Sequence, residues 1–468
     1  MVDADSAAAS EKHRAVVSTV LIAALAVRCV AEVLFLLPSP VGDGGFFITA
    51  SANYCRSGFL GTTAYAIDPT GQSRMVWHGF VSIMLFGAAS ASCSARSYYL
   101  LLWLLKASTL GAVLVLARRR EYSGPATVGM ALFVLAAQTA SGFRPETLAM
   151  LLVVLAEIAL AGGWYWMLGA LAGTLLCTQP TVAGVYALST LILRPELLKR
   201  WLPIGAGAVL TATTLLALYP FPVADLLAGI RLQAVRLVGR SDGRVLTYYF
   251  LNTAMPGWGL LLLAAATAAA RRTPWFLLMV PVLWFFGPRV PPAFYNLVPL
   301  TVMLIAVAFE RSSPALANLL GFLGIGVGVL GLGFVSTRDL MTAYRYGDTF
   351  AATSARVSRL ALESRTFDSV PPMLGLTNPE LRLMEPLVRS ETMSASAPAG
   401  LNVFAVNGMP RSPCPAESPT EKPVSLSIGQ KILFNSNSGW MIYVCDPSEA
   451  MPAAQRSRLG ANPSQQRP

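Results

Sequence analysis

Asp43 is the first residue whose position suggests chemistry. It stands in the stretch "FLLPSPVGDGGFFITASANYCRSGFLG" (34–60), a few residues after a long apolar run has ended. Its flanking glycines are typical of a turn, so a solvated loop carboxylate is one interpretation. The other is a general base. A carboxylate partly desolvated beside apolar segments has a raised pKa, which suits proton abstraction from a hydroxyl group near neutral pH.

Arg144 and Glu146, in "GFRPET", stand at the junction of two further apolar runs. Charged residues there either extend towards lipid headgroups or face a cavity. A guanidinium group forks onto phosphate oxygens, so Arg144 is a candidate phosphate ligand. Glu146 would orient Arg144 or help to hold a cation. Gln179 precedes Pro180 in "CTQPTV". That pattern favours simple punctuation between two helices, although the amide keeps a hydrogen-bond donor.

Other candidate residues occur in three polar segments. In the first, Arg74 and His78 are four residues apart, so they can share one helical face. The second, 220–245, predicts an amphipathic basic helix that either coats anionic lipid or clamps a lipid phosphate. The third, "FFGPRVPPAFYNLVPL", combines an arginine with aromatic residues, which also suits a membrane interface. The candidate phosphate ligands are Arg74, His78, Arg240, Arg244 and Arg289, and the candidate cavity-lining residues are Tyr248, Tyr249 and Tyr295.

The composition shows which kind of fold must position these residues. Of 468 residues, 54% are hydrophobic and only 13% are charged. Soluble globular chains have about 25% charged residues, so the sequence indicates a polytopic, mainly α-helical membrane protein. The net charge of +11 is first a topology signal. No basic stripe of the kind that nucleic-acid binding requires is visible.

Apolar runs predict about eleven membrane-spanning helices. The runs are 15–36, 98–117, 125–142, 147–161, 163–179, 181–194, 201–219, 246–270, 274–287, 292–309 and 314–335. The first is interpreted as a retained span rather than a signal peptide, because no cleavage site follows it.

The basic clusters fit this count if the N-terminus is cytoplasmic. All five then fall on the cytoplasmic side, as positive-inside topology requires: 11–14, 118–120, 194–200, 271–272 and 310–311. The fit holds only if 76–93 does not span, so this segment is expected to lie in the outer interface. The outer face would then gather the first loop (37–97), 141–146, 178–181, 220–245 and 287–296.

The tail differs in composition from the rest of the chain. Residues 1–335 are expected to form the transmembrane module, 336–449 a small α+β outer domain and 450–468 a disordered tail. "GWMIYVCDP" and "VSLSIGQKILF" are typical of strands. Cys414 and Cys445 would be able to pair in an oxidising compartment, but the sequence leaves this open.

The first outer loop resembles that of polyprenyl-phosphate-dependent membrane glycosyltransferases of the GT-C architecture, such as protein O-mannosyltransferases and aminoarabinose transferases. The resemblance lies in "DGGFFITASANYCRSGF", an acid after the first span followed by aromatic residues, a helix and a glycine, and in "VWHGFVSIMLFG". It covers about residues 15–310. The chain departs from the family in two ways: it lacks the two prolines after His78, and it has one acid where many relatives have two.

This resemblance implies a bacterial inner-membrane enzyme with its C-terminal domain in the periplasm. The donor would be a polyprenyl-phosphate sugar, and the acceptor a hydroxyl group of a glycan, lipid or protein. Asp43 would be the base, and Arg144 and Arg289 would face the donor phosphate. Relatives often have a lysine near the position of Gln179.

The simplest mechanism is direct displacement with inversion, since no second acid is placed as a nucleophile. No cofactor is obligatory, and the few acids near the site do not favour a divalent metal. A polysaccharide polymerase or ligase that acts on lipid-linked glycans is an alternative that would not need Asp43. A transporter is a weaker alternative, because its intramembrane charges would not gather at one face.

Overall fold

The computed structural model describes most of the helical part of the chain and four short strands of the tail. The described residues are 4–35, 43–58, 79–90, 92–219, 224, 255–270, 293–360, 366–368, 383–384, 402–407 and 440–445. The chain divides into two compact units. Unit 1 comprises Met1–Pro38, Val76–Ser82 and Tyr99–Thr337, and unit 2 comprises Ser39–Met75, Ile83–Tyr98 and Arg338–Pro468.

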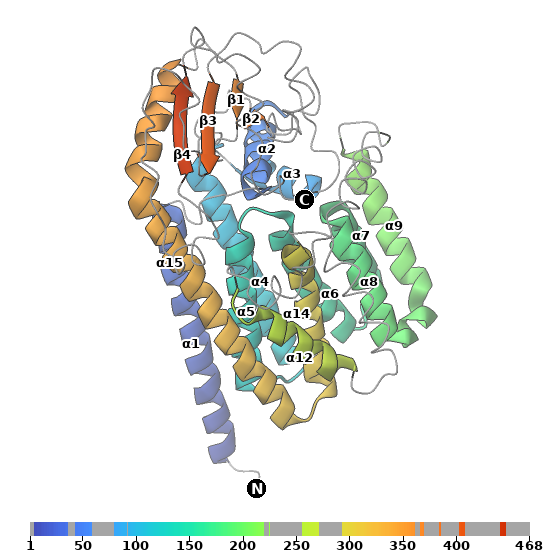
Figure 1. Cartoon of the computed structure of the whole chain (residues 1–468). Coiled ribbons are helices and arrows are strands. Elements are labelled where there is room, and N and C mark those ends of the chain that lie inside the picture. Colours follow the sequence, from blue (N-terminus) through green and yellow to red (C-terminus); the bar gives the residue numbers. More distant parts are fainter. Residues whose placement is uncertain are drawn as a thin grey trace, which may run out of the picture. The chain divides into compact units, whose positions relative to one another are not determined.

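Helices make up nearly all of the described part of unit 1 (Figure 1). The described helices of both units are, in chain order, α1 (Ala4–Phe35), α2 (Asp43–Ser57), α3 (Phe80–Ala89), α4 (Ala95–Arg119), α5 (Gly124–Ser141), α6 (Pro145–Ala161), α7 (Tyr165–Thr178), α8 (Pro180–Leu193), the 3-10 helix η1 (Pro195–Arg200), α9 (Trp201–Ala217), α12 (Trp258–Ala270), α14 (Ala293–Arg311) and α15 (Pro314–Leu360).

The described helices agree with the apolar runs of the sequence. Within the described residues, α4, α5 and the first part of α15 are long and apolar enough to cross a membrane, and α8 with η1 and α9 makes a fourth candidate, bent by 109°. The chain is therefore a helical protein with several candidate spans. The count of eleven stays a prediction, and the run 274–287 lies outside the described residues.

Helices α7 and α9 pack closely because glycines line their contact. A Cβ atom on Gly169 would lie 2.1 Å from the carbonyl oxygen of Ile204, and one on Gly173 would lie 2.4 Å from that of Ala208. From the first contact to the second, the position advances by four residues along both helices, so the two helices run parallel. Gly169 and Gly173 form the small-xxx-small pattern that lets helix backbones approach in a membrane, where burial of apolar surface does not drive association.

The Gly169→Ala variant is expected to lose about 1–3 kcal/mol of stability, because the new methyl group meets backbone that cannot move aside. Gly184→Ala on α8 is the matched control, since its Cβ would meet nothing within 4 Å. The control should gain about 0.5–1 kcal/mol from the higher helix propensity of alanine. Thermal unfolding of the purified variants in detergent measures both changes. Equal midpoints for the two variants would contradict this close approach.

Helix α15 includes both the last apolar run and the first part of the tail. The sequence placed a change of domain at 335/336, and the boundary between the two units lies nearby at 337/338, within a helix that continues without a break from Pro314 to Leu360. No proline interrupts residues 315–360, so nothing in this stretch forces the backbone out of helical geometry.

The tail contains a small mixed sheet in unit 2. Its strands are β1 (Thr366–Asp368), β2 (Leu383–Met384), β3 (Asn402–Asn407) and β4 (Trp440–Cys445), in the spatial order β2-β1-β3-β4. Strands β3 and β4 are antiparallel, whereas β1 is parallel to both of its neighbours. The expected strand in "GWMIYVCDP" is present as β4, and "VSLSIGQKILF" lies outside the described residues.

Candidate functional site

Two helix starts in unit 1 carry the candidate site. Helix α5 ends at Gly142, whose φ of 56° lies in the left-handed region that glycine adopts without strain. The chain then turns, and Arg144 becomes the N-cap of α6, with Pro145 in the first helical turn. Gln179 is likewise the N-cap of α8, ahead of Pro180. Proline suits this position because its missing N–H would have no partner there.

The structure brings Arg144, Glu146 and Gln179 together. Gln179 Nε2 donates to Glu146 Oε1 at 2.9 Å, and Arg144 donates to the same carboxylate from Nε and Nη2, both at 3.3 Å. Their exposed fractions are 0% for Glu146, 4% for Gln179 and 8% for Arg144. The charged pair is therefore almost fully desolvated, which strengthens its interactions with any anion that enters.

Glu146 also benefits from its place on α6. It lies in the first helical turn, where the positive end of the helix dipole stabilises a carboxylate. Beside it, Thr147 Oγ1 donates to the carbonyl oxygen of Gly142 at 2.6 Å. Gln138 Nε2 then donates to Thr109 Oγ1 at 2.7 Å and to the carbonyl oxygen of Thr147 at 2.9 Å. The first turn of α6 is therefore fixed to α4 and α5 by buried hydrogen bonds.

Several segments expected on the outer face meet at this end of unit 1. The backbone N–H of Gly79, next to His78, donates to the carbonyl oxygen of Thr178 at 2.9 Å. The rings of Phe80 and Tyr219 lie 5.0 Å apart, which brings the end of α9 to the same region. The "SGFRPE" and "TQPT" turns therefore lie together with Gly79 of the first loop, while the membrane side of this end stays a prediction.

The opposite end of α6 carries a second buried ionic cluster. Arg194 donates from Nη1 and Nη2 to the two oxygens of Glu157 at 3.1 and 2.8 Å, and from Nη2 to Glu310 at 3.1 Å. Arg120 Nη2 lies 3.3 Å from Glu310 Oε1, and the Tyr186 hydroxyl donates to Glu157 at 3.2 Å. Three basic clusters of the sequence, 118–120, 194–200 and 310–311, thus meet at one end, as the positive-inside pattern predicts. That this end is cytoplasmic stays a prediction.

The two arginine–glutamate pairs of α6 differ in geometry. Arg194 makes a short two-point contact with Glu157, whereas both contacts of Arg144 with Glu146 are 3.3 Å long. Charge-assisted hydrogen bonds are strongest at about 2.7–2.9 Å, so Glu146 holds Arg144 less firmly than Glu157 holds Arg194.

A third buried ionic cluster, absent from the sequence-based candidates, joins α1, α4 and α15. Arg28 Nε donates to Glu32 Oε1 at 2.8 Å, Lys106 Nζ donates to the same oxygen, and Arg28 Nη1 donates to Ser336 Oγ at 3.0 Å. Glu32 and Lys106 are completely buried. The sequence does contain a signal for this cluster, because Arg28 and Glu32 lie inside the apolar run 15–36 and Lys106 lies inside the run 98–117. Ionisable residues are rare in membrane helices and mark a structural or functional contact.

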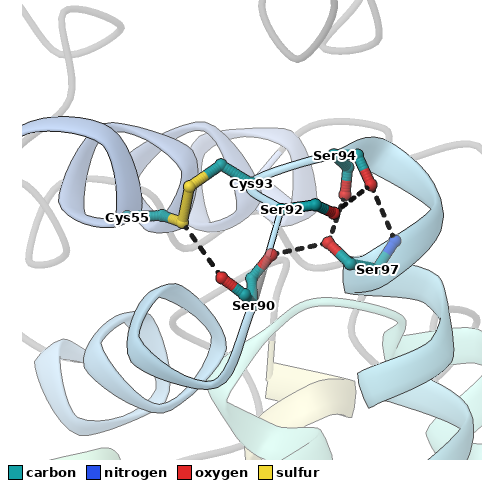
Figure 2. The surroundings of a disulfide bond; sticks show 6 residues. All are labelled: Cys55, Ser90, Ser92, Cys93, Ser94 and Ser97. Atoms are coloured by element: carbon teal, nitrogen blue, oxygen red, sulfur yellow. Dashed lines mark hydrogen bonds between the residues drawn. A yellow bond between two sulfur atoms is a disulfide. The ribbon is translucent and has the colours of Figure 1, made fainter.

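Unit 2 contains a disulfide between Cys55, near the end of α2, and Cys93, just before α4 (Figure 2). Cys55 Sγ lies 3.3 Å from the carbonyl oxygen of Ser90, and Ser90 Oγ lies 2.5 Å from Ser97 Oγ. Disulfides persist in oxidising compartments, so the bond agrees with an extracytoplasmic first loop. The sequence had considered Cys414 and Cys445 instead; Cys414 lies outside the described residues, so that pairing is not tested.

Replacing Cys55 with serine is expected to destabilise the first loop by about 4 kcal/mol, the chain-entropy value for a separation of 38 residues. Thermal unfolding would measure the loss of stability. Non-reducing peptide mapping of the wild type would show the Cys55–Cys93 pairing directly. The Cys93→Ser variant and the double variant should show the same loss as the single one, because all three remove one bond. Losses that add in the double variant would contradict the pairing.

The other sequence-based candidates are only partly described. Asp43 is the first residue of α2 in unit 2, and Tyr295 lies in the first turn of α14, but the structure describes neither side chain. The remaining candidates lie outside the described residues: Arg74, His78, Arg240, Arg244, Tyr248, Tyr249 and Arg289. Among the described residues, no group of three or more histidine, cysteine, aspartate or glutamate side chains is placed to hold a metal ion.

Comparison with known proteins gave one similar solved structure. No protein-family model and no curated protein matches the chain. The chain is similar to ArnT from Cupriavidus metallidurans, solved with undecaprenyl phosphate bound, at 15% sequence identity and a TM-score of 0.49. The match covers 83% of this chain and 93% of that one. The assignment of function therefore rests on the residues of this chain.

Proposed function

We propose that the chain is an integral membrane glycosyltransferase of GT-C architecture that transfers a sugar from a polyprenyl-phosphate donor to an acceptor hydroxyl group. The observation that carries the proposal is the buried cluster of Arg144, Glu146 and Gln179. It lies at the end of unit 1 where the sequence places its outer loops. The sequence alone makes Arg144 a candidate phosphate ligand and Glu146 a candidate to orient it.

Arg144 would bind the donor phosphate. In glycosyl transfer from a lipid phosphate, the leaving group is already anionic and needs positive donors rather than an acid. Arg144 supplies a guanidinium group, and the N-termini of α6 and α8 add the partial positive charge of their helix dipoles. Because its contacts with Glu146 are long, Arg144 can turn part of its donor set towards a phosphate.

Glu146 and Gln179 would act through Arg144. Glu146 holds the guanidinium group of Arg144 beside the N-termini of α6 and α8. The Gln179 amide keeps the Glu146 carboxylate in place by donating to Oε1 at 2.9 Å. A lysine at the position of Gln179 would supply its own charge to the phosphate. This chain has an uncharged amide there, so arginine must supply more of the positive charge that stabilises the phosphate.

Asp43 would remove the proton from the acceptor hydroxyl. The hydroxyl oxygen attacks the anomeric carbon, the bond from that carbon to the phosphate oxygen breaks, and the polyprenyl phosphate leaves with the bonding electrons. One displacement inverts the configuration at the anomeric carbon, through a transition state with oxocarbenium character.

The proposal is tested by sugar transfer with purified protein in detergent. A panel of synthetic polyprenyl-phosphate monosaccharides, each radiolabelled in the sugar, is incubated with envelope glycan, lipid and protein fractions as acceptors. Label is expected to move from one donor to one acceptor class with inverted anomeric configuration. Transfer only from lipid-linked oligosaccharides would replace the proposal with a polymerase or ligase. Uptake of labelled solute into proteoliposomes without any covalent transfer would replace it with a transporter.

A further inference from the structure

We propose that unit 1 has a binding site for the phosphate of an anionic glycerophospholipid, at the end of α6 opposite to Arg144. The site, called here the arginine–aromatic cluster, consists of Arg119, Trp164, Tyr165 and Arg200. It is separate from the proposed reaction, and only the choice of lipid class rests on the proposed donor site at Arg144.

The cluster is built on the turn between α6 and α7. The guanidinium carbon of Arg119, in the last turn of α4, lies 4.3 Å from the centroid of the Trp164 ring. That of Arg200, at the end of η1, lies 5.5 Å from the ring centroid of Tyr165. Two arginines from distant parts of the chain therefore stack on consecutive aromatic residues of one turn.

Two glycines make this stacking possible. Gly163 has a φ of 69°, so the chain can reverse between the two helices at this residue. A Cβ atom on Gly162 would lie 2.8 Å from Nη1 of Arg119 and 2.9 Å from the Trp164 ring. Any side chain at Gly162 would therefore force Arg119 or the Trp164 ring to move, so the contact between them requires glycine at this position.

Both guanidinium groups keep hydrogen-bond donors available for an anion. In the described part of the chain, neither Arg119 nor Arg200 forms an ion pair, in contrast to Arg120 and Arg194 at the same end. Stacking on an aromatic ring uses the face of the guanidinium group and leaves its N–H groups at the edge. Those N–H groups match the spacing of two phosphate oxygens.

The surroundings of the cluster favour a lipid over a soluble phosphate. Trp166 and Trp201 are 58% and 67% exposed, and Leu202 is 63% exposed. A Cβ atom on Gly207 would lie 2.6 Å from the carbonyl oxygen of Trp166, so the first turn of α7 lies against the second turn of α9. Exposed tryptophans are typical of the membrane interface, where they flank headgroups, and the apolar faces below them suit acyl chains.

The lipid class follows from position and charge. Arg118 and Lys199 are also exposed, so the region is rich in cations. Basic residues at a membrane surface gain about 1 kcal/mol each from anionic lipid, or about five-fold in affinity. The polyprenyl-phosphate donor is proposed to bind near Arg144, at the other end of the same helix. A glycerophospholipid of the bulk membrane, such as phosphatidylglycerol, is therefore the expected occupant.

Native mass spectrometry of the full chain in detergent, titrated with phosphatidylglycerol, tests this site. The Arg119→Gln/Arg200→Gln variant is expected to bind the lipid roughly 100-fold more weakly than the wild type, because each arginine loses charge-assisted hydrogen bonds to the phosphate, at about ten-fold each. The matched control is Arg118→Gln/Lys199→Gln, which removes the same charge from adjacent exposed residues that stack on no described ring. In detergent there is no anionic leaflet to attract cations in general. This control should therefore bind nearly as well as the wild type.

Three results would overturn the proposal. Equal weakening in the two double variants would show that total charge, rather than a built site, attracts the lipid. Equal binding of phosphatidylcholine and phosphatidylglycerol by the wild type would show that anionic charge is not recognised. Displacement of phosphatidylglycerol by an equal concentration of undecaprenyl phosphate, blocked in the Arg119→Gln/Arg200→Gln variant, would reassign the site to the polyprenyl carrier.

Discussion

Replacing Asp43 with asparagine is expected to lower the rate of sugar transfer by about 100- to 10,000-fold, the usual contribution of a general base. The amide has nearly the shape of the carboxylate but cannot accept the proton of the acceptor hydroxyl. Folding should be preserved, because Asp43 begins α2 and asparagine is as favourable as aspartate at a helix start. Transfer is measured with the donor identified from the panel, at saturating acceptor, and reported per folded protein.

Two controls make the result interpretable. Asp68 belongs to the same loop and directly precedes Pro69, a pattern typical of a turn. The Asp68→Asn variant is therefore expected to transfer sugar at the wild-type rate. The thermal midpoint of Asp43→Asn should also match. If Asp43→Asn transfers sugar at the wild-type rate, the base is another group, and Asp43 is the solvated turn residue of the first interpretation.

Replacing Arg144 with lysine is expected to reduce transfer by about 100- to 1,000-fold, the usual loss when one donor to a developing anion is removed. Lysine keeps the positive charge, so Glu146 is not left as an unpaired buried carboxylate. It loses the planar fork that contacts two phosphate oxygens at once. The exchange should weaken the pair with Glu146 only slightly, because both of its contacts are already 3.3 Å long.

The other end of α6 supplies the matched control. Arg194→Lys makes the same exchange in the pair with Glu157, where the contacts measure 3.1 and 2.8 Å. This variant is expected to lose about 2 kcal/mol of stability, the scale of one charge-assisted hydrogen bond, and to keep its transfer rate per folded protein. If both variants lost stability while their transfer rates stayed at the wild-type level, Arg144 would be a structural residue.

The sequence was most informative about where helices begin and end. Pro145 and Pro180 follow residues that interrupt apolar runs, and both occupy the first turn of a helix, where their fixed φ is favourable. Counting runs between these breaks also shows which turns share an end of the bundle. That is why Arg144, Glu146 and Gln179 could be expected near one another.

Contacts between helices were harder to predict. The apolar run at 15–36 predicts the helix α1, but it does not show that this helix places Glu32 beside Lys106 of α4. The disulfide was missed for a similar reason, since cysteine counts do not determine connectivity. The amide of Gln179 was interpreted mainly as helix punctuation, whereas the structure uses it to hold Glu146.

The cluster of Arg28, Glu32 and Lys106 bears on the order in which the chain enters the membrane. An isolated charged residue at the centre of a helix adds about 2.5–3.5 kcal/mol to the free energy of insertion from the translocon. Arg28 and Glu32 neutralise each other within one helix and can insert as a pair. Lys106 is synthesised 74 residues after Glu32, so its charge finds a carboxylate already in the bilayer if α1 stays beside the translocon. The first helix would then act as an intramolecular chaperone for the fourth during synthesis.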